Sequence, residues 1–138
     1  MADIYSGNWI ERSASPRHEG EPENKAIPHT ESHSRTCGDA VCVYLDYDDQ
    51  DVICHGYFTG DCCAVCKASA DLMIDAIEGK TRKEAAQISE AFRRVMRDDV
   101  NGTDLALIGQ AAEMLPVREL PSRTKCACLP WKALELLL

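Results

Sequence analysis

The chain has 138 residues, and 15 Lys and Arg side chains against 23 Asp and Glu give it a formal charge of −8 at pH 7. Domains commonly hold roughly 100 to 150 residues, so we expect a single domain over residues 1–138. The negative charge argues against binding to nucleic acid or anionic membrane surfaces and favours basic protein partners. With no apolar run near the roughly 18 residues of a membrane span and no secretory signal pattern, we expect a cytoplasmic protein.

The first part of the chain predicts one short helix followed by a loop. Apolar residues at Ile4, Trp9 and Ile10 predict a helix over residues 3–14, which Ser15-Pro16-Arg17 ends. Residues 17–35 are rich in Pro, Glu, His and Ser. We expect a loop there, with room for one poor strand.

Two alternating segments then predict an antiparallel hairpin. Residues 40–47 and 52–58 alternate apolar and polar side chains on either side of Asp48-Asp49-Gln50-Asp51. This pattern buries one face of each strand. Cys37 lies just before the hairpin and Cys63 just after it.

The second half of the chain predicts helices. Apolar residues recur at helical spacing over residues 63–77, and Gly79 is placed to end that helix. Thr81-Arg82-Lys83-Glu84 has the form of a capping box for a helix running to about residue 98. A third helix is expected over residues 103–115, ending at Pro116, and a loop through Pro121 to Cys126 precedes a last helix over residues 130–138. The order predicts an α+β fold in which a small antiparallel sheet of about three strands packs against helices.

Eight cysteines carry most of the chemistry, at positions 37, 42, 54, 62, 63, 66, 126 and 128. In a reducing cytosol such thiols favour metal binding or thiol catalysis over disulfides. Cys37, Asp39, Cys63 and Cys126 together supply three thiolates and one carboxylate, a set that suits zinc or an iron–sulfur cluster in the same site. At a helix start, Cys63 is expected to gain thiolate character from the helix dipole.

Several motifs, in this order and spacing, resemble the SufU, IscU and NifU amino-terminal group of iron–sulfur cluster assembly proteins. They are Ser15-Pro16-Arg17 with Gly20, Cys37-Gly38-Asp39, Phe58-Thr59-Gly60 before Cys63-Ala64-Val65, Ala68-Ser69-Ala70-Asp71-Leu72-Met73, Gly79-Lys80-Thr81, and Arg123-Thr124-Lys125-Cys126-Ala127-Cys128-Leu129-Pro130-Trp131. The SufU branch is the most similar, because 62 residues separate Cys63 from Cys126 and Lys125 precedes Cys126.

This resemblance implies a function in iron–sulfur cluster biogenesis. It implies that Cys37, Asp39, Cys63 and Cys126 hold zinc in SufU-like members and a nascent 2Fe-2S cluster in scaffold members. It also implies a pyridoxal-phosphate cysteine desulfurase as partner, apo iron–sulfur proteins as recipients, and Cys126 as the acceptor of persulfide sulfur. The chain would then be a sulfurtransferase or a non-enzymatic scaffold.

The sequence also departs from the family pattern. Cys62 and Cys66 flank Cys63 where the family usually has Gly and Ser. They are candidates for alternative ligands or persulfide carriers, or for buried packing residues. The IscU chaperone-binding motif is replaced by Leu120-Pro121-Ser122-Arg123.

Other residues are weaker candidates for the site. We expect Cys42 and Cys54 to be packing residues in strands, and Cys128 to lie near the site without taking part in it. We expect the histidines to be solvated, and His33 is the one candidate among them for a replacement ligand. Arg123 and Lys125 either stabilise a thiolate at Cys126 or form a solvated basic loop.

Two functions of other classes stay open. One is a structural zinc-binding interaction domain without sulfur-transfer activity. The other is a thiol–disulfide oxidoreductase, because Cys63-Ala64-Val65-Cys66 has the redox spacing, although no βαβ pattern accompanies it.

Overall fold

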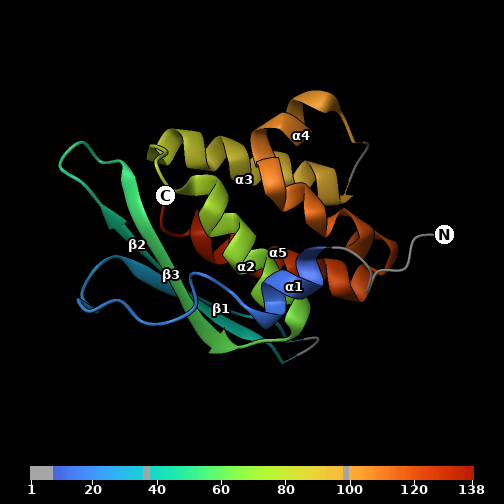
Figure 1. Cartoon of the computed structure of the whole chain (residues 1–138), viewed down its shortest axis with the longest axis horizontal. Coiled ribbons are helices and arrows are strands. Elements are labelled where there is room, and N and C mark those ends of the chain that lie inside the picture. Colours follow the sequence, from blue (N-terminus) through green and yellow to red (C-terminus); the bar gives the residue numbers. More distant parts are fainter. Residues whose placement is uncertain (1–7, 36–37, 98–99) are drawn as a thin grey trace.

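A three-stranded antiparallel sheet lies at one side of the molecule, with helices gathered on its other side (Figure 1). The structure, a computed structural model, describes residues 8–35, 38–97 and 100–138. The strands are β1 (His29–His33), β2 (Ala40–Tyr47) and β3 (Ile53–Asp61), in the order β1-β2-β3. The predicted α+β class is confirmed. Strand β1 corresponds to the one poor strand that was expected within residues 17–35.

The β2–β3 hairpin follows its sequence pattern. Val41, Val43 and Leu45 alternate along β2 and are fully buried, as a half-buried strand requires. In the turn, the Asp48 side chain accepts hydrogen bonds from the backbone N–H of Gln50 and Val52, at 2.8 and 3.0 Å. β3 continues to Asp61, three residues past the predicted end, so it delivers the chain directly to Cys63.

Helices α1 (Asn8–Ala14), α2 (Ala64–Ile77) and α3 (Arg82–Arg97) match the predicted helices within the described residues. The capping box is confirmed: Thr81 Oγ1 accepts from the Glu84 N–H at 3.2 Å, and Glu84 Oε1 accepts from the Thr81 N–H at 3.1 Å. Within the described part of the chain, no helix is long and apolar enough to cross a membrane.

The predicted boundaries in the last third of the chain are wrong. Helix α4 (Gly102–Ile108) stops at Gly109, whose φ of 54° interrupts the helix, and a 3-10 helix, η1 (Gly109–Glu119), then runs through Pro116. Helix α5 (Pro121–Glu135) begins at Pro121, which suits the first helical turn because its missing N–H is not needed there. Cys126 therefore lies within α5 and not in a loop before a helix at Pro130.

Side-chain contacts fix α5 against α3 and α2. Trp131 stacks on Phe92 with ring centroids 4.1 Å apart, and its Nε1–H donates to Ser69 Oγ at 3.0 Å. Ser69 in turn donates to the Ala127 carbonyl at 2.5 Å. These fully buried polar groups satisfy one another, and they hold Cys126 of α5 close to the start of α2.

Candidate functional site

Three of the four predicted ligands converge from separate elements. Asp39 lies just before β2, Cys63 is the N-cap of α2, and Cys126 lies in α5. One ligand atom from each residue lies within 4.8 Å of the other two. The fourth predicted ligand, Cys37, lies outside the described residues.

The Asp39 carboxylate is held in place but not fully satisfied. Asp39 is 7% exposed, and its Oδ1 accepts a hydrogen bond from the Cys63 N–H at 3.1 Å. Its other oxygen, Oδ2, is buried and has no hydrogen-bond partner among the residues that the structure describes. A buried carboxylate oxygen without a partner is costly unless a cation or a proton is nearby.

The Cys63 thiol occupies the predicted helix start, but its pKa moves against the expectation. Burial raises the pKa of Cys63, and the Asp39 carboxylate raises it further. The backbone of Cys66 and the Cys126 thiol lower it, but by less. The helix start alone therefore does not make this thiol a thiolate; added positive charge in the site would.

Cys126 is the most enclosed of the described ligands. It is 1% exposed, and its Sγ lies 3.6 Å from the Ser122 carbonyl oxygen. Pro130, four residues later, has no N–H to bond the Cys126 carbonyl. Cys63, in contrast, borders a cavity of about 220 Å³, which is also lined by Trp9, Ile10, Ser13, Ala64, Val65 and Arg123.

These observations fit a bound cation. Two thiols and a carboxylate lie close together, one buried carboxylate oxygen has no partner in the described parts of the chain, and one thiol has a raised pKa. Zinc and iron–sulfur clusters both take such donors. The described residues therefore have the chemistry of a sulfur-rich metal site.

The other cysteines lie beside or away from this site. Cys66 is fully buried, and its thiol hydrogen-bonds that of Cys62, which lowers the pKa of Cys62 and raises that of Cys66. Cys128 lines a separate pocket with Lys125, Lys132 and Arg93. Arg123 lines the cavity beside Cys63, so the two basic neighbours of Cys126 face different pockets.

His33 and His18 differ in their exposure to solvent and in their partners. His33 is 65% exposed at the end of β1, beside Glu31. His18 is only 15% exposed, and its Nε2 lies 2.7 Å from Asp75 Oδ1, so the expectation that it is solvated is wrong. A signal was present: Asp71 and Asp75 recur four residues apart on an apolar helix, where a buried acid needs a partner.

The described part of this α+β fold thus brings together two thiols and a carboxylate, a donor set that could hold a metal ion. Residues 4–127 match the family described as NifU-like N terminal domain, and the chain belongs to this family. It is 29% identical over 132 residues to the iron–sulfur cluster assembly scaffold protein IscU of Streptococcus pyogenes serotype M1, covering 96% of this chain and 80% of that protein. It is 32% identical to the zinc-dependent sulfurtransferase SufU of Bacillus subtilis (strain 168), covering 96% of this chain and 87% of that one.

A solved structure agrees with these relatives. The chain superposes with a TM-score of 0.85 on a candidate iron–sulfur cluster assembly scaffold protein for the SUF system from Fervidobacterium islandicum AW-1, at 32% identity and with 97% and 96% of the two chains covered. The predicted family is therefore confirmed.

Proposed function

We propose that this protein works in iron–sulfur cluster biogenesis, and that Cys37, Asp39, Cys63 and Cys126 form its site. The observation that carries the proposal is the buried Asp39 Oδ2, which has no hydrogen-bond partner among the described residues and lies beside two convergent thiols. Relatives named as a cluster scaffold and as a zinc-dependent sulfurtransferase support it. We propose one domain over residues 1–138.

As a scaffold, the protein would bind a 2Fe-2S cluster as its cargo. The thiolates of Cys37, Cys63 and Cys126 would ligate iron together with the Asp39 carboxylate. An oxygen ligand holds iron less firmly than a fourth thiolate would, which favours release to an apo-protein. Cys63 borders the cavity, so we expect the cluster to enter and leave the site on that side.

As a sulfur acceptor, the protein would take sulfane sulfur from a pyridoxal-phosphate cysteine desulfurase. The same four residues would then hold zinc, which when bound supplies the positive charge that keeps their thiols deprotonated. The Cys126 thiolate attacks the outer sulfur of the desulfurase persulfide, a new S–S bond forms on Cys126, and the desulfurase cysteine leaves as a thiolate. Because Cys126 is 1% exposed, docking of the partner must expose it.

A reducing compartment suits both versions. No disulfide joins the described cysteines, which are residues 42, 54, 62, 63, 66, 126 and 128, and the cytosol maintains such a reduced state. We therefore place the protein in the cytoplasm.

The test is sulfur transfer from a desulfurase supplied with isotopically labelled cysteine, read by mass spectrometry without reduction. Wild-type protein should carry labelled persulfide on Cys126, and Cys126→Ser should lose it. Cys128→Ser is the matched control, because Cys128 lies in the same helix but lines another pocket. Equal labelling of Cys126→Ser and wild type would contradict the acceptor assignment.

The labelling experiment, combined with cluster loading and metal chelation, also tests the alternative of a structural zinc domain. A wild-type protein that takes up neither labelled sulfur nor a cluster, but unfolds when its metal is chelated, would support that alternative.

A further inference from the structure

A second group of side chains that could hold a metal ion lies at the other end of α2. One ligand atom from each of His18, Asp75 and Glu78 lies within 4.8 Å of the others. Glu78 is the C-cap of α2 and Cys63 its N-cap. Fifteen residues at 1.5 Å each place the two ends about 22 Å apart, so this group is separate from the thiol site.

Asp75 fixes the orientation of the His18 ring. His18 Nε2 lies 2.7 Å from Asp75 Oδ1, while Arg12 and Arg17 bond the other oxygen, Oδ2, at 2.6 and 2.5 Å. An ionised carboxylate can only accept, so Nε2 carries the proton and Nδ1 of the neutral ring keeps its lone pair. A carboxylate behind an imidazole is the usual support of a metal-ligating histidine.

The free side of His18 faces Glu78. Glu78 Oε2 lies 3.9 Å from His18 Nδ1 and 4.0 Å from His55 Nδ1, too far for hydrogen bonds. Two donors on one tetrahedral zinc, with bonds of about 2.0 Å, lie about 3.3 Å apart. The Gly56 N–H donates to Glu78 Oε2 at 3.2 Å and steadies it; the ion-pair partners of Glu78 among the described residues are these two imidazoles.

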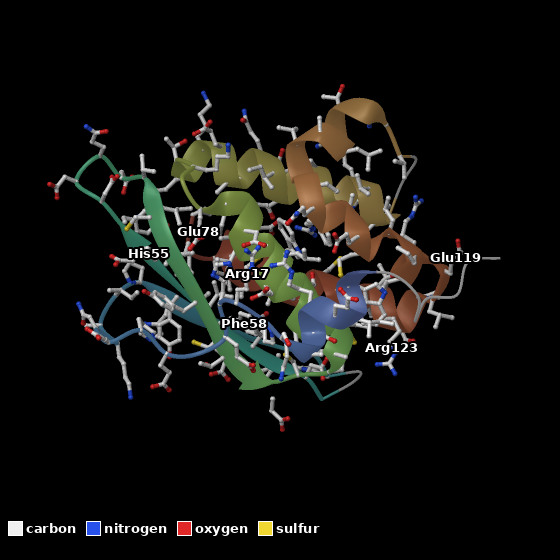
Figure 2. The ribbon with its side chains drawn as sticks, viewed as in Figure 1. Arg17, His55, Phe58, Glu78, Glu119 and Arg123 are labelled. Carbon is white, nitrogen blue, oxygen red and sulfur yellow. The ribbon has the colours of Figure 1, made fainter. Side chains whose placement is uncertain are left out.

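The group opens onto a cavity of about 430 Å³ at the surface. Glu19 and Glu21 also line this cavity, each paired with a lysine, Lys67 and Lys25 respectively. Arg17 lines it too and bonds Asp75. Figure 2 shows His55 from β3 close to Glu78 at the end of α2. His55 is 64% exposed, so its ring can turn toward an ion without disturbing the core.

We propose that His18, His55 and Glu78 bind a divalent transition-metal ion, with Asp75 as the support of His18. The donors are two imidazole nitrogens and a carboxylate oxygen, which suit zinc, cobalt, nickel or copper. This donor set differs from the thiolates at the other end of α2. The two sites can therefore be told apart by their spectra.

The test is a cobalt(II) titration of the full-length protein, prepared free of metal and of oxygen. Cobalt bound to thiolates gives intense sulfur-to-metal absorption in the near ultraviolet, whereas cobalt on nitrogen and oxygen gives only weak visible bands. Wild type should bind about two ions per chain, one of each spectral kind. His55→Ala should weaken the nitrogen–oxygen ion at least about tenfold and leave the thiolate ion unchanged.

His29→Ala is the matched control, because His29 is an exposed histidine on β1, in the same sheet as His55. The variant Cys63→Ser/Cys126→Ser separates the two proposals, since it should lose the sulfur band and keep the nitrogen–oxygen ion. Binding of no nitrogen–oxygen ion by wild type would overturn this second site, as would an equal effect of His55→Ala and His29→Ala. Either result would leave the thiol site untouched.

Discussion

Gly60 shows how closely the backbone is packed beside the site. Gly60 lies in β3, opposite Val41 of β2, and Val41 is two residues after Asp39 in the chain. The φ of Gly60 is 148°. A Cβ there would lie 2.1 Å from the Ala40 carbonyl oxygen, so the two strands would have to separate. We expect Gly60→Ala to lower the free energy of unfolding by about 2–4 kcal/mol, measured by urea denaturation.

Gly20→Ala is the control for this prediction. Gly20 has a similar φ of 138°, but a Cβ there would meet nothing within 4 Å. It should therefore show the cost of the backbone conformation without the clash, about 1 kcal/mol. Equal losses in the two variants would contradict the packing argument.

At the residue scale, the sequence could indicate which side chains matter but not their environment. Asp39, Cys63 and Cys126 were identified by residue type and family pattern, and the structure brings them together. The raised pKa of Cys63 could not be predicted, because it depends on burial and on contact with Asp39 across 24 residues. The same holds for His18, whose partner Asp75 is 57 residues away.

At the scale of elements, Asp75 joins α2 to α1 and to the segment that follows it, through Arg12, Arg17 and His18. Burial alone would raise the pKa of Asp75, but the bonds from His18 and Arg17 and the charge of Arg12 lower it below its usual 3.8. The folded state then binds the proton less readily than the unfolded state. The stabilisation from these ion pairs is complete above the pKa that Asp75 has in the unfolded state. It is lost as the pH falls through the lower pKa that Asp75 has in the folded state.

We therefore expect the free energy of unfolding to fall below pH of about 4, and Asp75→Asn to be less stable at pH 7 with a flatter acid limb. Urea denaturation between pH 3 and 7 measures both. Asp49→Asn, in the exposed turn between β2 and β3, should behave as wild type. An acid limb that Asp75→Asn leaves unchanged would show that the ion pairs contribute little.

The helix boundaries show where local patterns are sufficient. The capping box at Thr81 and the hairpin turn at Asp48 depend on bonds within a few residues, so they were predictable. Pro130 was misread as a helix start because a proline in a helix interior is locally unfavourable. The stacking of Trp131 on Phe92 and the hydrogen bond from Ser69 to the Ala127 carbonyl hold α5 together through that proline, and sequence alone does not show such contacts.

For the whole molecule, α2 connects two regions of different chemistry. Its N-terminal end carries the thiol site, and its C-terminal end carries Glu78, whose carboxylate lies 3.9 Å from His18 and 4.0 Å from His55. The family pattern predicted the first region because its motifs lie in the sequence itself. The second region forms between β3, α2 and the segment after α1, and so could be found only in the fold.

The most direct measurement is the content of iron, zinc and acid-labile sulfide per chain, on protein purified without oxygen and without added metal. We expect either about one zinc bound through sulfur, or iron with matching sulfide, and loss of that metal in Cys63→Ser and Cys126→Ser. X-ray absorption separates this ion from one held by nitrogen and oxygen. A wild-type protein without sulfur-bound metal, or variants that keep it in full, would contradict the assignment of Asp39, Cys63 and Cys126 as ligands.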